Sequence, residues 1–293
     1  MLTIAIPCYK SNLDYLEQAI KSVERQSMKC CELVIVDGND VPDIHLQELA
    51  KRYLNIPVRY VYNSGDKSMA GNWNFAISLC NTELVTLLHS DDLLDPEYIR
   101  SMFYLANMNT SAAAYFCGAH IINKSSQRSW SFSDMIKLFI QPKGGMVTLY
   151  GERGIIALLK GCFIFCPTIC YRKSELENQS FNSQWKMVTD FQFYIDLLAK
   201  NKTIIGTQDK LYFYRRHNEN QTSKLTYNCK RFAEEVAIYE QVIDRFNSSA
   251  DVVSVASKKK IIKLHLIFLI LKSLIFFRFN TAYRYFRFLI VSV

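Results

Sequence analysis

Apolar and polar positions follow two different patterns along the first third of the chain, one typical of strands and one of helices, and together they predict an α/β fold. Short runs rich in β-branched residues are typical of buried strands, and four occur, at Thr3–Pro7, Glu32–Asp37, Val58–Tyr62 and Leu84–Leu88. Between them, apolar residues recur every three or four positions, which predicts helices at Leu13–Gln26, Ile44–Tyr53 and Ala70–Cys80. This alternation indicates a mainly parallel, Rossmann-like sheet flanked by helices.

The pattern is less regular after this point. Ala112–Cys117 predicts another strand, and the polar stretch Ile121–Gly145 has the length of a lid or substrate-binding loop. Helices are predicted at Leu149–Leu159 and from about Asp190 to Lys200, separated by the apolar stretch Gly161–Tyr171 and a loop.

Composition allows a sizeable core without disulfide bonds, because the 293 residues are 49% hydrophobic and 21% charged. The nine cysteines lie mostly in apolar stretches, which favours reduced thiols in a cytosolic protein. Cys162, Cys166 and Cys170 lack the CxxC spacing of zinc sites, so core packing is their favoured role. The N-terminus shows neither a basic leader nor a long apolar run, so we expect the protein to stay inside the cell.

Two adjacent carboxylates, Asp91 and Asp92, follow the strand that ends at Leu88. Ligands of open parallel sheets bind at the carboxyl ends of strands, where Tyr9 and Asp37 also fall. Burying two neighbouring anions is costly unless a cation compensates, and a hard divalent cation that bridges phosphate oxygens does so. The pair therefore predicts a metal site for a diphosphate-bearing substrate. The plainer alternative is that one aspartate caps the helix that follows.

A series of motifs over roughly residues 1 to 220 resembles the family 2 inverting glycosyltransferases, a large bacterial group with the nucleotide-sugar-binding GT-A fold. Ile4–Lys10 resembles the first strand of that family and its P-x-Y-N turn, and Glu32–Gly38 resembles the second strand. Asn63–Gly65 and Gly71–Ala76 resemble its N-x-G and the R-N-x-G/A helix start, with Gly71 in place of the usual Arg.

The resemblance implies donor-binding roles for the residues at these positions. Tyr9 would pack its ring on the nucleotide base, and Asp37 would accept a hydrogen bond from the base. Pro7 and Asn72 belong to the same nucleotide site, and Asp91 would lie beside the ribose or the donor sugar.

The four residues that begin with His89 resemble the D-S-D-D segment of the family, with His89 replacing its first Asp. The resemblance makes Asp92 the ligand of a Mg²⁺ or Mn²⁺ ion. Residues 212–223 resemble the closing Y-R-x-H-x-x-N-x-S signature, from which Arg215 would reach the diphosphate and His217 the metal. A basic surface loop is the plainer alternative for that segment.

The resemblance also implies a catalytic base, because Asp190 occupies the place of the E-D or T-D motif of the family. Asp190 would deprotonate an acceptor hydroxyl for an in-line displacement with inversion, while the metal stabilises the departing nucleoside diphosphate. Two alternatives stay open: Asp196 on the same helix is the base, or Asp190 is only a helix N-cap.

The C-terminal tail combines basic and apolar residues. Lys258–Lys260 introduce a Leu-, Ile- and Phe-rich stretch whose longest apolar run, Leu264–Leu271, is shorter than the ~20 residues that span a bilayer. We expect a basic amphipathic pair of helices that lies on anionic lipid. A helix packed on the catalytic domain, or on the partner of a homodimer, is the alternative.

These observations predict a GT-A catalytic domain over 1–225, with nucleotide-sugar binding in 1–118 and acceptor binding in 119–225, and a helical membrane-associating region over 226–293. The expected reaction moves a sugar from a nucleotide-diphosphate donor, with UDP favoured, to a hydroxyl of a glycan linked to polyprenyl diphosphate. The expected setting is O-antigen or capsule synthesis on the inner face of the cytoplasmic membrane. No nucleic-acid module is recognisable, so we expect no nucleic-acid partner despite the net charge of +8.

Two other functions compete. A nucleotidyltransferase shares the fold type and the metal carboxylates, but the Gly-rich phosphate loop expected after the first strand is missing. A non-catalytic module that binds a sugar nucleotide or a membrane is the second, because His89 and Gly71 replace family residues. Such a module would keep its ligand affinity after substitution of Asp190 or Asp92.

Overall fold

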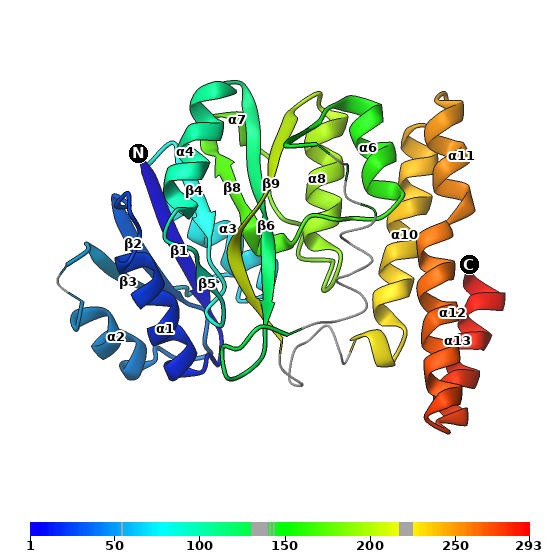
Figure 1. The fold of residues 1–293 in the computed structure, drawn as a ribbon, viewed down its shortest axis with the longest axis horizontal. Helices are drawn as coiled ribbons and strands as arrows, with labels where there is room; N and C mark the ends of the chain where they lie inside the picture. The colour runs from blue at the N-terminus through cyan, green and yellow to red at the C-terminus, as the bar shows by residue number, and fades with distance from the viewer. Residues whose placement is uncertain (54, 130–139, 141, 143, 217–224) are drawn as a thin grey trace.

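The computed structural model describes residues 1–53, 55–129, 140, 142, 144–216 and 225–293. Within these residues, nine strands form one mixed sheet in the order β3-β2-β1-β4-β8-β6-β9-β5, with β7 paired to β9 (Figure 1). Its N-terminal half is parallel and contains the four predicted strands, β1 (Leu2–Cys8), β2 (Glu32–Asp37), β3 (Val58–Tyr62) and β4 (Leu84–Leu87).

Helices connect the parallel strands as the spacing of apolar residues predicts. They are α1 (Leu13–Glu24), α2 (Ile44–Lys51) and α3 (Met69–Leu79). Asn12 caps α1 and Ser68 caps α3, each accepting a hydrogen bond from a backbone N–H of the first turn. Strands β1 and β2 are almost wholly buried, as expected for a parallel sheet that helices cover on both faces.

The second half of the sheet differs more from the prediction. Its strands are β5 (Leu93–Leu94), β6 (Ala112–Ile122), β7 (Met146–Leu149), β8 (Ile169–Arg172) and β9 (Thr203–Arg215). Strand β6 continues to Ile122 rather than ending at Cys117, because it pairs with β9 over its whole length. The long β9 carries the chain back to the carboxyl end of β4.

The helices of this half are α4 (Tyr98–Met108), α6 (Gly151–Leu159), the short α7 (Lys173–Leu176) and α8 (Thr189–Ala199), with a 3₁₀ turn at Cys166–Thr168. The helices predicted from Leu149 and from Asp190 are therefore confirmed within two residues of each end. Most of the predicted insertion, including 130–139, lies outside the described residues, so its role as a lid stays a prediction.

Four helices form the C-terminal region: α10 (Lys230–Arg245), α11 (Ala250–Lys258), α12 (Lys260–Ile275) and α13 (Phe279–Ser292). The predicted helix pair is present as α12 and α13, whereas α10 and α11 pack beside α8 and α6 (Figure 1). Phe232, Tyr239 and Val252 belong to the same buried cluster as residues of α6 and α8. Ile262 of α12 and Tyr285 of α13 also belong to this cluster, so one side of the predicted helix pair packs on the rest of the chain, and its membrane contact stays a prediction. None of the described helices is both long and apolar enough to cross a membrane.

Candidate active site

The turn after β4 lies where the strands of the parallel half end, and β9 closes on it. Asp92 is fully buried in this turn. Its Oδ1 accepts the backbone N–H of Arg215 at 2.7 Å, and its Oδ2 accepts the hydroxyl of Tyr212 at 3.0 Å. Burial, and then the charge of Asp91, raise the pKa of Asp92 well above its usual range. Asp92 is therefore anchored by β9 behind the surface of the site.

His89, Asp91 and Asp92 bring ligand atoms to within 4.8 Å of one another, a group that suits a metal ion. The side chain of His89 is 26% exposed, against 1% for Asp92, and its Nδ1 lies 3.7 Å from Asp92 Oδ2. Burial lowers the pKa of His89, so the imidazole is neutral at pH 7, the form that binds a metal. His89 differs from the residue found at this position of the family motif, but its place in the structure makes it a candidate metal ligand.

The guanidinium of Arg215 is directed at protein partners. Its Nε donates to the carbonyl of Asp91 at 2.6 Å, its Nη2 donates to Gln18 at 2.9 Å and its Nη1 donates to Ser126 at 2.9 Å. Tyr15 lies under the guanidinium at 4.3 Å. Arg215 thus braces the carboxylate turn, and the predicted diphosphate contact requires some of these bonds to be exchanged. His217, the other residue predicted from this motif, lies outside the described residues.

The predicted base-binding residues flank the end of β1. Tyr9 is 52% exposed, as a ring that stacks on a ligand must be. Asp37 is fully buried and accepts three hydrogen bonds, from the backbone N–H groups of Asn39 and Asp43 and from the hydroxyl of Tyr60 at 2.6 Å. The carboxylate of Asp37 therefore organises the loop after β2, and contact with a base would add to this role.

Asn72 lies beneath the same edge of the sheet and is almost completely buried. Its amide donates to the carbonyl of Cys8 at 3.4 Å and accepts from Asn63 at 3.2 Å. A Cβ on Gly38 would lie 2.7 Å from the Asn72 amide nitrogen, so the turn after β2 requires glycine there. Pro7 pairs with Val36 one residue before the end of β1, which places it in the same sheet edge.

Position 71, where the family has Arg, is occupied in a different way. A Cβ on Gly71 would lie 2.2 Å from the carboxyl carbon of Asp66, so the acidic side chain fills the space that a larger residue would enter. In this structure, the side chain of Asp66 therefore occupies the space that the side chain of an Arg at position 71 would enter.

Asp190 lies in the first turn of α8, whose N-cap is Val188, so the N-cap alternative for Asp190 is wrong. The charge of Asp190 contributes to raising the pKa of Tyr171, after the larger effect of burial, and Tyr171 lines a narrow recess together with His89. Asp196, the alternative base, pairs with Arg245 of α10 at 2.6 Å, which favours a structural role for it.

Helix α10 also holds the turn that leads into α8. The carboxylate of Glu234 accepts the backbone N–H of Met187 at 2.8 Å and that of Lys186 at 3.1 Å. Sequence patterns did not reveal this contact, because Glu234 and Lys186 are far apart in the chain.

Comparison with known proteins defines the class. The family model for glycosyl transferase family 2 matches residues 3–179. The chain therefore belongs to glycosyl transferase family 2. The fold resembles residues 1–349 of S. aureus TarS, crystallised with UDP-GlcNAc, with a TM-score of 0.62 and 19% identity over 83% of this chain and 66% of that one. The predicted GT-A fold is confirmed.

Relatives of known name are distant. A GalNAc(5)-diNAcBac-PP-undecaprenol beta-1,3-glucosyltransferase of Campylobacter jejuni is 29% identical over 63% of this chain and 55% of its own length. The putative glycosyltransferase EpsH of Bacillus subtilis is 24% identical over 77% of this chain and 63% of its own length. The bifunctional glycosyltransferase pgtA of Dictyostelium discoideum is 21% identical over 84% of this chain. The chain spans only 36% to 63% of the length of these three relatives.

Proposed function

We propose that this protein is an inverting glycosyltransferase that moves a sugar from a UDP-sugar to a glycan hydroxyl. The observation that carries the proposal is the grouping of His89, Asp91 and Asp92 at the end of β4. The proposed base, Asp190, lies in the first turn of α8. The TarS structures, which contain UDP-GlcNAc or UDP on a similar fold, support a uridine nucleotide as the donor.

The group suits a divalent cation, because its two carboxylates and its neutral imidazole bring ligand atoms to within 4.8 Å of one another. Asp91 and His89 are the more exposed members, and Asp92 supports them from behind. An imidazole ligand favours Mn²⁺ over Mg²⁺, which prefers carboxylates and water. When bound, the metal would act as a Lewis acid toward the departing nucleoside diphosphate.

Asp190 is the proposed general base. It would take the proton of the acceptor hydroxyl as the hydroxyl oxygen bonds to the anomeric carbon and the bond from that carbon to the diphosphate oxygen breaks. One displacement of this kind inverts the anomeric configuration. A carboxylate is a weak base toward a hydroxyl, so proton transfer accompanies the attack rather than preceding it.

The α12–α13 hairpin offers a membrane-binding surface. Its turn exposes three phenylalanines, Phe276 by 63%, Phe277 by 80% and Phe279 by 61%. Other exposed apolar side chains lie along both helices, at Leu264, Ile267, Leu271, Leu274, Ile275, Tyr283, Phe286, Ile290 and Val291. Exposed cations are interspersed among them, at Lys272, Arg278, Arg284 and Arg287. Apolar side chains flanked by cations fit the interface of an anionic bilayer.

The orientation of the hairpin supports a lipid-linked acceptor. In Figure 1, β1 runs from the N-terminus at the top toward the lower edge, and the turn between α12 and α13 lies at that same lower edge. The carboxyl ends of the parallel strands and the apolar turn thus face the same side. A protein held by this turn would present its site to a glycan carried on polyprenyl diphosphate at the inner face of the cytoplasmic membrane. The C. jejuni relative, whose name specifies an undecaprenol-linked glycan, supports this acceptor class.

The donor and the metal can be tested together. Wild-type protein and the Asp91→Asn variant are incubated with a panel of UDP-, GDP- and dTDP-sugars, with Mn²⁺ or with a chelator. We expect release of UDP from one donor, dependent on Mn²⁺ and lost in the variant. Nucleotide binding by calorimetry with no release of a nucleoside diphosphate from any donor would overturn the enzyme assignment in favour of a binding module.

A further inference from the structure

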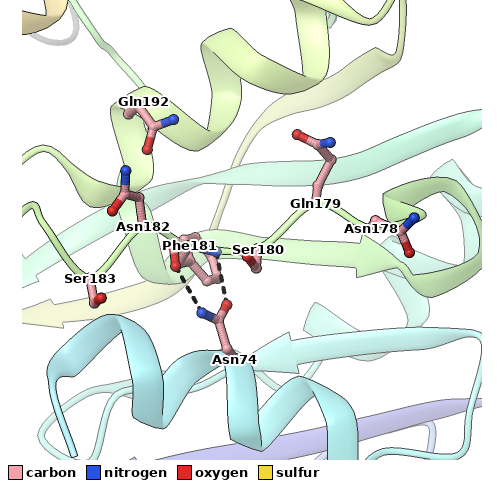
Figure 2. A pocket seen from close by; sticks show the side chains of 8 residues that line it. All are labelled: Asn74, Asn178, Gln179, Ser180, Phe181, Asn182, Ser183 and Gln192. Atoms are coloured by element: carbon pink, nitrogen blue, oxygen red, sulfur yellow. Dashed lines mark hydrogen bonds between the residues drawn. The ribbon is translucent and has the colours of Figure 1, made fainter. Parts of the chain in front are cut away.

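A pocket of about 500 Å³ lies between α3, the segment before α8 and α8 itself (Figure 2). None of the described residues that line it carries a charge. Its lining consists of five amide side chains, among them Asn74, Asn182 and Gln192, together with two serines and Phe181. The pocket is thus polar but neutral, in a protein whose net charge is +8.

The inner wall of the pocket is held rigidly. Asn74 clamps the segment onto α3, since its side-chain nitrogen donates to the carbonyl of Phe181 and its oxygen accepts the N–H of Phe181, both at 2.8 Å (dashed in Figure 2). The ring of Phe181 packs into the core against Trp73 and Phe193. A wall fixed in this way reduces the entropy lost when a ligand binds.

Gln192 contributes an acceptor that is left without a donor. Its amide nitrogen donates to the carboxylate of Asp196, and because a carboxylate only accepts, this contact fixes which way the amide faces. The opposite atom, Oε1, is buried and receives no hydrogen bond from any residue that the structure describes. Figure 2 shows this oxygen turned toward Asn182. A buried acceptor without a partner is costly, and a ligand hydroxyl would satisfy it.

The pocket adjoins the proposed reaction centre. Phe181 lines both this pocket and the recess beside His89. Trp73 links the two sides, since it meets Phe181 edge-on at 5.1 Å and stacks on His89 at 5.7 Å. On α8, Gln192 follows Asp190 by two positions, so the helix that carries the base also carries the free acceptor.

We infer that this pocket binds a neutral sugar unit of the acceptor glycan, next to the unit that receives the new sugar. The inference rests on the proposed glycosyl transfer. Each amide offers both donors and an acceptor, the pairing that vicinal sugar hydroxyls and acetamido groups require. The lining offers no cation to a carboxylate or phosphate substituent, so the chemistry selects a neutral rather than an acidic unit.

The test uses an array of neutral and acidic oligosaccharides, probed with the full chain in the presence of UDP and Mn²⁺. Gln192→Met keeps the volume of the side chain and removes its hydrogen bonds. Gln184→Met is the matched control, an exposed glutamine of the same segment that does not line the pocket. We expect a neutral glycan to bind wild type and the control, and to bind Gln192→Met about tenfold more weakly, as the loss of one hydrogen bond implies.

Donor hydrolysis without acceptor is measured on the same samples, and we expect wild type and Gln184→Met to hydrolyse the donor equally. Hydrolysis with no neutral glycan bound, with acidic glycans alone bound, or with binding unchanged in Gln192→Met would overturn the pocket assignment and leave glycosyl transfer intact. Absence of donor hydrolysis in wild type would instead overturn the proposed function on which the inference rests.

Discussion

Asp91 and Asp92 are neighbours in the chain but differ in environment. Asp92 is enclosed and accepts hydrogen bonds from Arg215 and Tyr212, whereas Asp91 is partly exposed. Asp92→Ala leaves a buried N–H and a buried hydroxyl without their acceptor, so we expect it to lower the free energy of unfolding by about 1–3 kcal/mol. Urea denaturation measures this effect. Asp91→Ala is the matched variant, and an equal loss of stability in both would contradict the separate roles.

The cation site should weaken in acid because of His89. A metal competes with protons for the imidazole, and burial lowers the pKa of His89, so affinity for Mn²⁺ should hold through neutral pH. It should fall only below the ordinary histidine value of about 6.5. Calorimetric titration of Mn²⁺ into the UDP complex at a series of pH values measures this profile. In His89→Gln, which cannot be protonated, the acid fall due to His89 should disappear; an unchanged profile would exclude His89 as a ligand.

Among the secondary-structure elements, bounds were predicted best where a single periodicity of apolar residues continues without interruption. Strands β1 to β4 and helices α1 to α3 fall close to their predicted bounds. Strand β9 was missed because its exposed middle, Gln208–Lys210, interrupts the apolar pattern. The role of Arg215 in bracing the carboxylate turn was missed as well, because it depends on where the end of β9 lies in the folded chain. Local residue types predicted the Asp91–Asp92 pair as a site, and the family resemblance predicted Asp190, but contacts across long sequence separations, such as that of Glu234, leave no local pattern.

Helix α10 should influence catalysis through the turn before α8. Glu234→Ala removes the acceptor of the Lys186 and Met187 N–H groups, so the start of α8 and the position of Asp190 become less fixed. We expect kcat to fall about tenfold while affinity for UDP is unchanged, because misplacing a reacting group affects the chemical step. Steady-state kinetics and calorimetry measure the two. Glu240→Ala, on the same helix, is the control; a fall in UDP affinity alone would contradict the proposed route.

At the scale of the whole molecule, the catalytic sheet and the C-terminal helices share a core, while the α12–α13 turn is exposed on the side of the site. We expect wild type to sediment with vesicles that contain anionic lipid, less strongly as salt rises. Phe276→Ser combined with Phe277→Ser should weaken this binding about tenfold or more, because two exposed rings no longer enter the interface.

Tyr104→Ser is the control for this pair, since Tyr104 is 63% exposed on α4, away from the hairpin. Light scattering shows whether the hairpin is covered in another way. A homodimer that the double variant dissociates, with wild type left in the supernatant of every vesicle mixture, would assign the hairpin to a second copy of the chain and not to a membrane.

Asp190 is the proposed base of the glycosyl transfer reaction, so its loss should slow the chemical step and leave donor binding intact. Turnover of the UDP-sugar and calorimetric affinity for UDP with Mn²⁺ are therefore measured on wild type and Asp190→Asn. We expect unchanged affinity and a rate about 10²–10⁴-fold lower in the variant, the usual contribution of a general base. Turnover equal to that of wild type would contradict the role of Asp190, and binding without turnover in wild type would contradict the enzyme assignment itself.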